Sequence, residues 1–250
     1  MIAQLSDFIF PKVIAHRGAP CLAPENTTPA LMAAIDAGAL YIETDVQLAS
    51  TGEACLFHDD NLERTSNGRG NFEVQRWQDI QQLDAGSWFD AGFKDTRIPL
   101  LAEWLQVAAQ HRVGLNIEIK PSQQTQAVVD ATHAVIDQYW SEELPPLIIS
   151  SKSKQVLHYS AKIAPTVARG WVCTRWYFFG VKTLRQLGCV SLHIKHDFLS
   201  ASRIKAVRDA GFHVLAYTVN DQARAQQLFD WGVSAIFSDN MRLITKFDGA

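Results

Sequence analysis

Two short apolar runs in this 250-residue chain each carry a pair of charged residues two positions apart. Glu43 and Asp45 interrupt LYIETDV, and Glu118 and Lys120 interrupt LNIEIK. Residues i and i+2 of a strand share a face, so each pair is expected to point the same way. Ionised carboxylates on an apolar strand are costly unless they are paired or bind a metal ion. The three acids therefore predict an all-oxygen site for one divalent cation, Mg²⁺ or Ca²⁺ rather than Zn²⁺.

A purely structural interpretation of these acids stays open, because Lys120 and Arg17 could neutralise them in an ion-pair ladder. The same two cations would supply positive charge to the site. Together with a divalent cation they would form a clamp suited to an anion such as a phosphodiester. The two roles are compatible.

Two histidines are expected beside the acids. His16 follows the apolar run 13–15, and His58 follows a turn about Ser50–Thr51. If the chain folds back there as a hairpin, His58 lies opposite Glu43 within about one residue of register. Two histidines converging on carboxylates indicate acid–base catalysis. The other histidines have no such placement: we expect His111 and His133 on helix surfaces and His196 at a strand end, where it is a further candidate.

The elements that must position these residues follow a repeated pattern of a helix, a glycine and a short apolar run. It appears in DAGALYIETD (36–45), RQLGCVSLHI (185–194), RDAGFHVLAYT (208–218) and FDWGVSAIFSD (229–239). Glycine in that position is typical of the left-handed residue after a helix. Helices alternating with apolar strands favour a parallel sheet.

The pattern predicts eight strands and eight following helices. The strands are expected near 12–16, 40–47, 113–119, 146–150, 165–171, 190–195, 212–218 and 234–238. The helices are expected near 29–37, 99–110, 123–138, 153–162, 180–187, 201–210, 221–231 and 240–247. Eight strands with short returns, in a chain of this length, favour a closed (β/α)₈ TIM barrel. An open doubly wound sheet remains an alternative, because strand order cannot be read from sequence.

Residues 60–97 do not fit the alternation. The segment is too long for an ordinary βα loop and contains Phe72, Trp77, Trp88, Phe89 and Phe93. We interpret it as a small insertion after the second strand, packed over one end of the barrel. The chain, 1–250, is then a single domain with an insertion at about 60–97.

Polar residues gather at one end of the expected strands, while the opposite ends are mostly apolar. At the carboxyl ends we expect His16-Arg17-Gly18, Glu43, Asp45, Glu118, Lys120, Ser150-Ser151, Arg169, Lys195-His196, Tyr217 to Asn220, and Ser238-Asp239. Ligands of such barrels bind at that end. The asymmetry therefore predicts the mouth of an active site.

Composition excludes several classes of protein. Hydrophobic residues make up 47% of the chain, which argues against disorder, and no apolar stretch is long enough to span a membrane. A net charge of −3 gives no basic nucleic-acid footprint or polybasic membrane patch. The first residues, with Asp7, do not resemble a signal peptide, so a cytoplasmic location is expected. The four cysteines have no CxxC spacing and are expected to be unpaired.

The chain resembles the glycerophosphodiester phosphodiesterase family, specifically its bacterial cytosolic members. The matching stretches run in order along the chain: IAHRGAPCLAPENT (14–27), AAIDAGALYIETDVQL (33–48), LFHDDNLERTSNGRG (56–70), LDAGSWF (83–89), RIPLLAEWL (97–105), LNIEIKP (115–121), AYTVND (216–221) and GVSAIFSDN (232–240). The resemblance implies a TIM barrel with the 60–97 segment as its insertion. It also implies cleavage of glycerophosphodiesters to sn-glycerol 3-phosphate and an alcohol with a divalent cation.

Residue roles follow from the same resemblance. It makes His16 and His58 the acid–base pair, and Glu43, Asp45 and Glu118 the metal ligands. It places Arg17 and Lys120 on the phosphate, with Glu25 and Asn26 beside the site. Two departures stand outside this set: Tyr217 replaces a frequent tryptophan in the substrate wall, and Asn240 replaces a frequent proline. The family analogy also suggests that the glycerol 2-hydroxyl attacks phosphorus, giving a cyclic phosphate that water opens.

Three other functions share part of this pattern. A phospholipase D or sphingomyelinase-like barrel would share the histidines and acids but act on lipid phosphodiesters, and the sequence shows no aromatic and basic surface for that purpose. A non-catalytic phosphate-binding barrel should lack one of the catalytic or metal residues. An interaction protein would leave the strand-end polarity unexplained. The expected partner is therefore a small-molecule glycerophosphodiester, without nucleic acid or membrane insertion, and a homodimer is possible.

Overall fold

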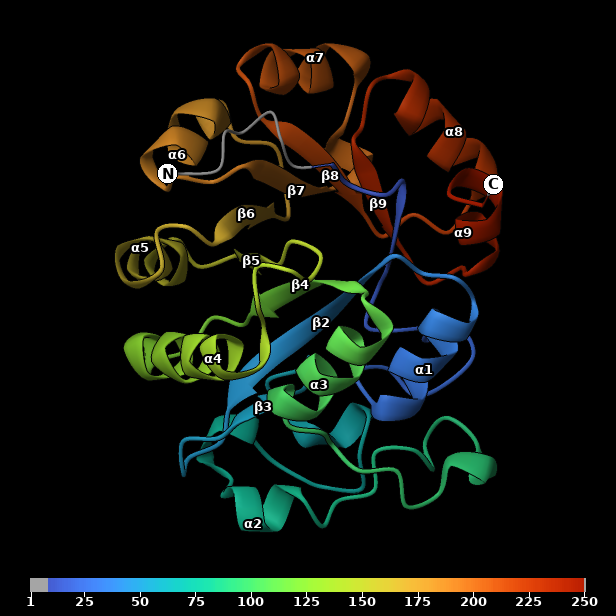
Figure 1. The fold of residues 1–250 in the computed structure, drawn as a ribbon, viewed down its shortest axis with the longest axis vertical. Coiled ribbons are helices and arrows are strands. Elements are labelled where there is room, and N and C mark those ends of the chain that lie inside the picture. The colour runs from blue at the N-terminus through green and yellow to red at the C-terminus, as the bar shows by residue number, and fades with distance from the viewer. Residues whose placement is uncertain (1–8, 250) are drawn as a thin grey trace.

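Eight parallel strands close into a barrel in the computed structural model, which describes residues 9–249 (Figure 1). The barrel strands are β1 Val13–Ala15, β2 Tyr41–Leu48, β4 Gly114–Ile119, β5 Ile148–Ser151, β6 Ala168–Cys173, β7 Ser191–Lys195, β8 His213–Tyr217 and β9 Ala235–Ser238. Each strand pairs with the next, and β1 pairs with both β2 and β9 to close the ring. The (β/α)₈ TIM barrel is confirmed, and the open sheet is excluded. The interpretation of the first eight residues, including Asp7, lies outside the described residues.

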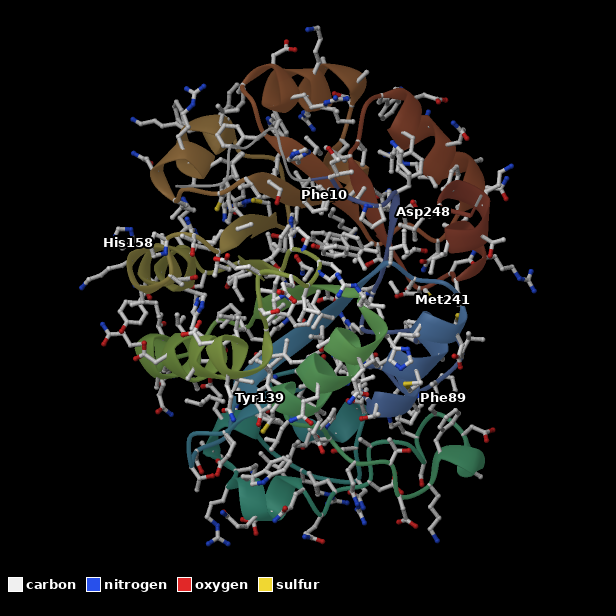
Figure 2. The ribbon with its side chains drawn as sticks, in the orientation of Figure 1. Phe10, Phe89, Tyr139, His158, Met241 and Asp248 are labelled. Carbon is white, nitrogen blue, oxygen red and sulfur yellow. The ribbon has the colours of Figure 1, made fainter. Side chains whose placement is uncertain are left out.

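Helices surround the strands (Figure 1). They are α1 Thr28–Asp36, α3 Leu101–His111, α4 Thr125–Tyr139, α5 Lys154–Ile163, α6 Gly180–Gln186, α7 Ala201–Asp209, α8 Gln222–Asp230 and α9 Arg242–Phe247. Each lies within two residues of its expected bounds. Side chains fill the space that the ribbons enclose (Figure 2).

Local signals in the sequence explain where these helices begin and end. Gly38 and Gly211 follow α1 and α7 with φ of 84° and 91°, a left-handed conformation that glycine adopts without strain. Ser153 and Asp221 precede α5 and α8, and their side chains accept hydrogen bonds from backbone N–H groups of the first turn. These residues fix where the helices begin and end, and after each helix the chain returns to the next strand.

A short hairpin extends from the rim of the barrel. β3, Ala54–Leu56, runs antiparallel to the end of β2, with Val46 opposite Leu56. The expected fold-back is therefore present, with a register one residue from the predicted one. The backbone N–H of Phe57 continues the pairing by donating to the carbonyl of Asp45 at 3.0 Å. The next residue, His58, consequently returns to the barrel mouth.

The segment 60–97 contains only short elements, at the lower end of the view in Figure 1. They are the 3₁₀ turns η1 Leu62–Arg64, η2 Phe72–Val74 and η3 Ala91–Phe93, and the helix α2 Trp77–Ile80. Its apolar side chains form a cluster with the hairpin, separate from the barrel core: Ala49, Cys55, Phe57, Leu62, Phe72, Ile80, Ala85 and Ile98. The segment therefore packs on the hairpin that carries His58.

Two sequence expectations were wrong. Arg169 lies at the amino end of β6, because the strand begins at Ala168; its guanidinium is buried there and donates to backbone carbonyls. His133 is buried on the face of α4 that packs on α5, where its Nε2 lies 2.9 Å from the Ser160 hydroxyl. The four cysteines are free, as expected.

Candidate active site

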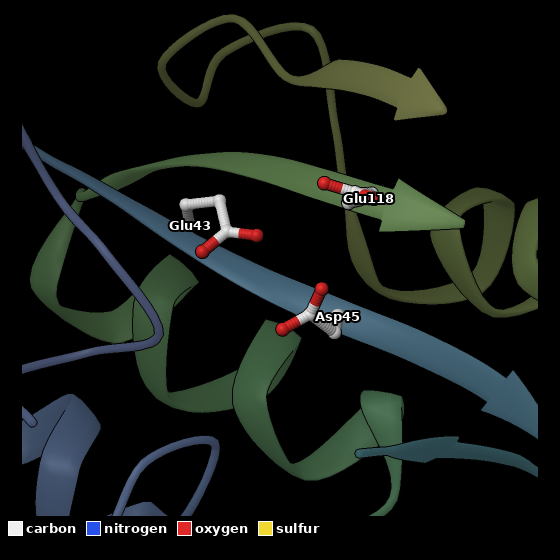
Figure 3. A group of neighbouring side chains, drawn as sticks. All are labelled: Glu43, Asp45 and Glu118. Atoms are coloured by element: carbon white, nitrogen blue, oxygen red, sulfur yellow. The ribbon is translucent and has the colours of Figure 1, made fainter. Parts of the chain in front are cut away.

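Three carboxylates converge between the middle of β2 and the carboxyl end of β4 (Figure 3). Glu43 and Asp45 share one face of β2, and Glu118 lies beside Asp45 in the register of the two strands. One oxygen of each carboxylate lies within 4.8 Å of the others. The three acids that the sequence places two positions apart or on neighbouring strands thus form a cluster of carboxylate oxygens inside an apolar barrel.

Two cations neutralise part of this cluster. The Nζ of Lys120 lies 3.1 Å from Asp45 Oδ1 and 3.4 Å from Glu118 Oε1, and the Nε of Arg17 lies 3.4 Å from Asp45 Oδ2. Burial opposes ionisation of Asp45, but Lys120 and Arg17 outweigh it and hold its pKa far below the usual range. The ion-pair ladder considered from sequence therefore exists around Asp45.

Glu43 is not neutralised in the same way. Its Oε2 accepts the backbone N–H of Arg17 at 2.9 Å, and the Nε2 of His16 lies 4.0 Å away. Burial, with repulsion from Asp45 and Glu118, raises the pKa of Glu43 well above its usual value. The ladder alone leaves a buried carboxyl group without a matching charge.

A divalent cation fits the residues present. It would supply the positive charge that Glu43 lacks, and carboxylate oxygens are preferred ligands of Mg²⁺ and Ca²⁺. The neighbouring Asn116 supports a polar ligand at this point, because its buried Oδ1 has no hydrogen-bond partner among the described residues. The donor set therefore accommodates one such ion, held by Glu43, Asp45 and Glu118.

His16 lies directly after β1, at one edge of the cluster. Its Nδ1 is 2.7 Å from Asp239 Oδ1, and the other oxygen of Asp239 accepts the side-chain amide of Asn220 at 2.8 Å. Burial opposes ionisation of Asp239, yet the bonds from His16 and Asn220 lower its pKa. A carboxylate fixed at Nδ1 leaves Nε2 available for proton transfer.

His58 occupies the equivalent position on the hairpin side. Its Nδ1 lies 2.5 Å from Asp59 Oδ1, and Asp59 also accepts the guanidinium of Arg64. Hydrogen bonding to Arg64, ahead of the bond to His58, lowers the pKa of Asp59 to about 2. Burial lowers the pKa of His58 itself. Both histidines are therefore oriented by a carboxylate, one on each side of the acids.

Glu25 and Asn26 lie beside the site, as the family resemblance implied. Glu25 accepts Arg17 Nη1 at 2.7 Å and also both terminal nitrogens of Arg64. Asn26 donates to Asp45 Oδ2 at 3.0 Å, while its oxygen accepts the Asp45 backbone N–H. These residues fix the positions of Arg17 and Asp45.

The cavity at the mouth, about 140 Å³, also has a wall that sequence reasoning did not identify. The missed lining residues are Asn116, Lys152, Val172, His193 and Phe237, whereas Ser150 and Thr218 were expected at the mouth. Alternation was the available signal, since Asn116 shares a face with Glu118, and His193 shares one with Lys195. His193 fits only because residue 170 is glycine: a Cβ there would lie 2.4 Å from its Nε2.

Tyr217 and His196 have different positions. Tyr217 lines the cavity as expected, with its hydroxyl donating to the carbonyl of Cys173 at 2.8 Å. His196 lies outside the cavity lining, where its Nδ1 is 3.3 Å from Asp197 and 3.4 Å from Arg224. His196 therefore has the surroundings of a surface residue and not of a site residue.

Comparison with known proteins agrees with this geometry. The model of the glycerophosphoryl diester phosphodiesterase family matches residues 16–243. The chain belongs to this family. An Oleispira antarctica phosphodiesterase, solved in complex with the product sn-glycerol-3-phosphate, is 35% identical with a TM-score of 0.93, covering 96% of this chain and 97% of that one. The resemblance noted from sequence is thus confirmed, and the chain is an enzyme of the phosphodiesterase class.

Two bacterial relatives cover nearly the same length. The glycerophosphodiester phosphodiesterase of Caldanaerobacter subterraneus is 30% identical over 91% of this chain and 93% of its own length. Bacillus subtilis YhdW is 32% identical over 94% and 96%. Among the residues that the structure describes, no helix has the length and apolar character needed to cross a membrane. Cytoplasmic location and dimerisation stay predictions.

Proposed function

We propose that this chain hydrolyses glycerophosphodiesters to sn-glycerol 3-phosphate and an alcohol by histidine acid–base catalysis with one bound divalent cation. The observation that carries the proposal is the pair of carboxylate-bound histidines, His16 and His58, on either side of three converging carboxylates. The product bound to the Oleispira relative supports the substrate class. The whole chain then acts as one phosphodiesterase domain, with 60–97 as its insertion.

The two histidines divide the proton transfers. One Nε2 removes the proton from the attacking hydroxyl, which by family analogy is the glycerol 2-hydroxyl, as its oxygen bonds to phosphorus. The other protonates the alkoxide that leaves as the phosphorus–oxygen bond breaks. In the second stage the roles reverse, and water opens the cyclic phosphate. Asp239 and Asp59 hold each imidazole with Nε2 toward the cavity.

Cationic side chains and the metal site would serve the phosphate. Arg17 lines the cavity, and Lys120 lies 3.1 Å from Asp45 and lines the adjoining hollow with His58. Both would stabilise negative charge on the phosphoryl oxygens. Glu43, Asp45 and Glu118 would hold Mg²⁺ or Ca²⁺, which supplies further charge stabilisation when bound. Tyr217 forms part of the wall that contacts the glycerol or the leaving alcohol.

The experiment measures sn-glycerol 3-phosphate released from a panel of glycerophosphodiesters and from intact phospholipid. We expect release from glycerophosphocholine or a similar compound, complete loss in EDTA, and recovery with Mg²⁺ or Ca²⁺. Circular dichroism in EDTA controls for unfolding. Full activity in chelator would contradict the metal assignment, and preference for intact phospholipid would favour the lipid-hydrolysing alternative.

A further inference from the structure

An exposed aromatic loop lies at the same end of the barrel as the cavity. Residues 174–179 follow the carboxyl end of β6 and lead into α6. Phe178 is 97% exposed, Phe179 77% and Tyr177 38%. From sequence no exposed aromatic and basic surface was expected, and the structure shows one here. Adjacent exposed phenylalanines are unfavourable in water and mark a contact surface.

The base of this loop is anchored, while its tip is not. The guanidinium of Arg203 lies 5.1 Å from the ring centre of Trp176, and that of Arg175 lies 5.3 Å from Tyr177. The Tyr177 ring also packs against Trp171 at 5.4 Å. The surrounding contacts therefore hold the loop in place and leave Phe178 and Phe179 in solvent.

The charge around the loop is one-sided. Residues 144–196 contain eight lysines and arginines and no aspartate or glutamate, so all 26 acidic residues of the chain lie elsewhere. Five of these cations belong to the carboxyl ends of β5 to β7 or to the starts of α5 and α6: Lys152, Lys154, Arg175, Lys182 and Lys195. All five are exposed. Asp197 lies 3.0 Å from the Nζ of Lys195 and offsets that charge, so Lys152, Lys154, Arg175 and Lys182 make the surface around the phenylalanines cationic.

We propose that this surface, Phe178 and Phe179 with the surrounding cations, docks the enzyme on an anionic lipid membrane. Aromatic side chains enter the headgroup region, and lysine and arginine contact anionic headgroups. A lipid surface accounts for both the apolar tip and the excess of positive charge. A second copy of this chain would place like charges against each other, which opposes association.

Docking there would bring the catalytic cavity toward the membrane. Lys152 belongs both to the cationic surface and to the cavity lining, and Val172 of β6 lines the cavity just before the loop begins. The enzyme would then take glycerophosphodiesters at or near the lipid surface. This orientation rests on the proposed function, whereas docking itself does not.

The test measures binding of the intact protein to vesicles by co-sedimentation, without substrate. Vesicles contain phosphatidylcholine with about 30% phosphatidylglycerol, or phosphatidylcholine alone. We expect binding to the anionic vesicles, at least about tenfold weaker binding to neutral ones, and a similar loss for the double variant Phe178→Ser with Phe179→Ser. Raising NaCl from about 0.1 M to about 1 M should also release the protein, because the Debye length falls from about 10 Å to about 3 Å.

Matched controls use exposed residues away from the loop. Leu40→Ser with Val74→Ser removes two other exposed apolar side chains, and Lys162→Glu with Arg185→Glu reverses charges at the far ends of α5 and α6. The controls should bind as the parent does, whereas Arg175→Glu with Lys182→Glu should not. Hydrolysis of soluble glycerophosphocholine should be unchanged in the double phenylalanine variant.

Three results would overturn the proposal. They are no binding of the parent to anionic vesicles, equal binding by the double phenylalanine variant, and a parent dimer in sedimentation velocity that the variant abolishes. Vesicle binding without any phosphodiesterase activity would support docking and reject the proposed function, so the two failures are distinguishable.

Discussion

The two sides of the cavity differ in charge. On the side of β1, β2 and β4, acids and cations contact one another within a few ångströms. On the side of β5 to β9 the lining consists of neutral groups and Lys152. Buried charges in an apolar barrel are tolerated only beside opposite charges. The contrast shows why the reactive groups share neighbouring strands. The opposite, mostly neutral wall is left to contact the substrate and to limit which substrates fit.

The largest expected effect comes from the histidines of the charged side. His16→Ala or His58→Ala should reduce kcat by about 10²- to 10⁴-fold, because each removes one proton-transfer group. Steady-state assays with glycerophosphocholine measure the loss, and exposed His111→Ala is the control. A substrate with a nitrophenol leaving group needs little protonation, so the variant lacking the acid should recover on it.

Near-full activity of either alanine variant on the natural substrate would remove that histidine from the mechanism. Recovery of both variants on the nitrophenol substrate would show that neither is the base. Either result would weaken the contrast between the two sides of the cavity.

A smaller effect is expected from Asn26, which orients a candidate ligand without contacting the cavity centre. Asn26→Ala should weaken divalent-cation affinity by about 10- to 100-fold, because Asp45 loses the amide that fixes it. Titration of activity with Mg²⁺ or Ca²⁺ gives the affinity. Asn71→Ala, on the surface of the insertion, is the control. Unchanged affinity with reduced stability would assign Asn26 to the fold alone.

The wall histidine should affect stability instead of catalysis. Burial lowers the pKa of His193 to about 3, so it is neutral in the folded chain and protonates from about pH 6.5 downward in the unfolded one. The unfolded state then binds more protons, so stability is lost as pH falls from about 6.5 toward 3, with a slope of at most about 1.4 kcal/mol per unit.

Urea unfolding at several pH values measures that slope. His193→Gln should flatten it relative to the parent, while exposed His111→Gln should leave it unchanged. The same slope in the parent and in His193→Gln would assign the acid sensitivity to other groups.

The smallest effect concerns Tyr217, a wall residue whose hydroxyl is bonded to the protein. Tyr217→Phe should destabilise the fold by about 0.5 to 1.5 kcal/mol, because the Cys173 carbonyl loses its donor. KM should change little, since the ring remains. Thermal unfolding and steady-state kinetics separate the two effects. A large rise in KM with unchanged stability would place the hydroxyl on the substrate.

The barrel could be predicted because four of its eight units repeat a local signal. Glycine after a helix and a following apolar run locate both element ends, and Gly38 and Gly211 have the expected left-handed backbone. The position of His58 followed from hairpin geometry. The register differed by one residue because the sequence does not specify the turn conformation. Arg169 was misplaced for a related reason. The expected strand, 165–171, begins and ends before the observed β6, Ala168–Cys173, so Arg169 was expected at the wrong end.

The charged half of the site was predictable, and the wall was not. Acids within apolar strands are conspicuous, so Glu43, Asp45 and Glu118 could be recognised one by one. His193 and Asn116 depend on which face of a strand turns inward, and neighbouring strands decide that. Phe178 and Phe179 lie between an expected strand and an expected helix, and their exposure depends on whether other segments cover that loop.

The bridge formed by Arg64 has a consequence for engineering. Arg64 belongs to the insertion, yet it binds Glu25 of the barrel and Asp59 beside His58. A segment swap that replaced 60–97 with that of another family member would cut this link unless the donor supplied an equivalent arginine. The insertion is therefore not an interchangeable module. A chimera should take Glu25 and Arg64 from the same parent, with no junction between residues 25 and 64.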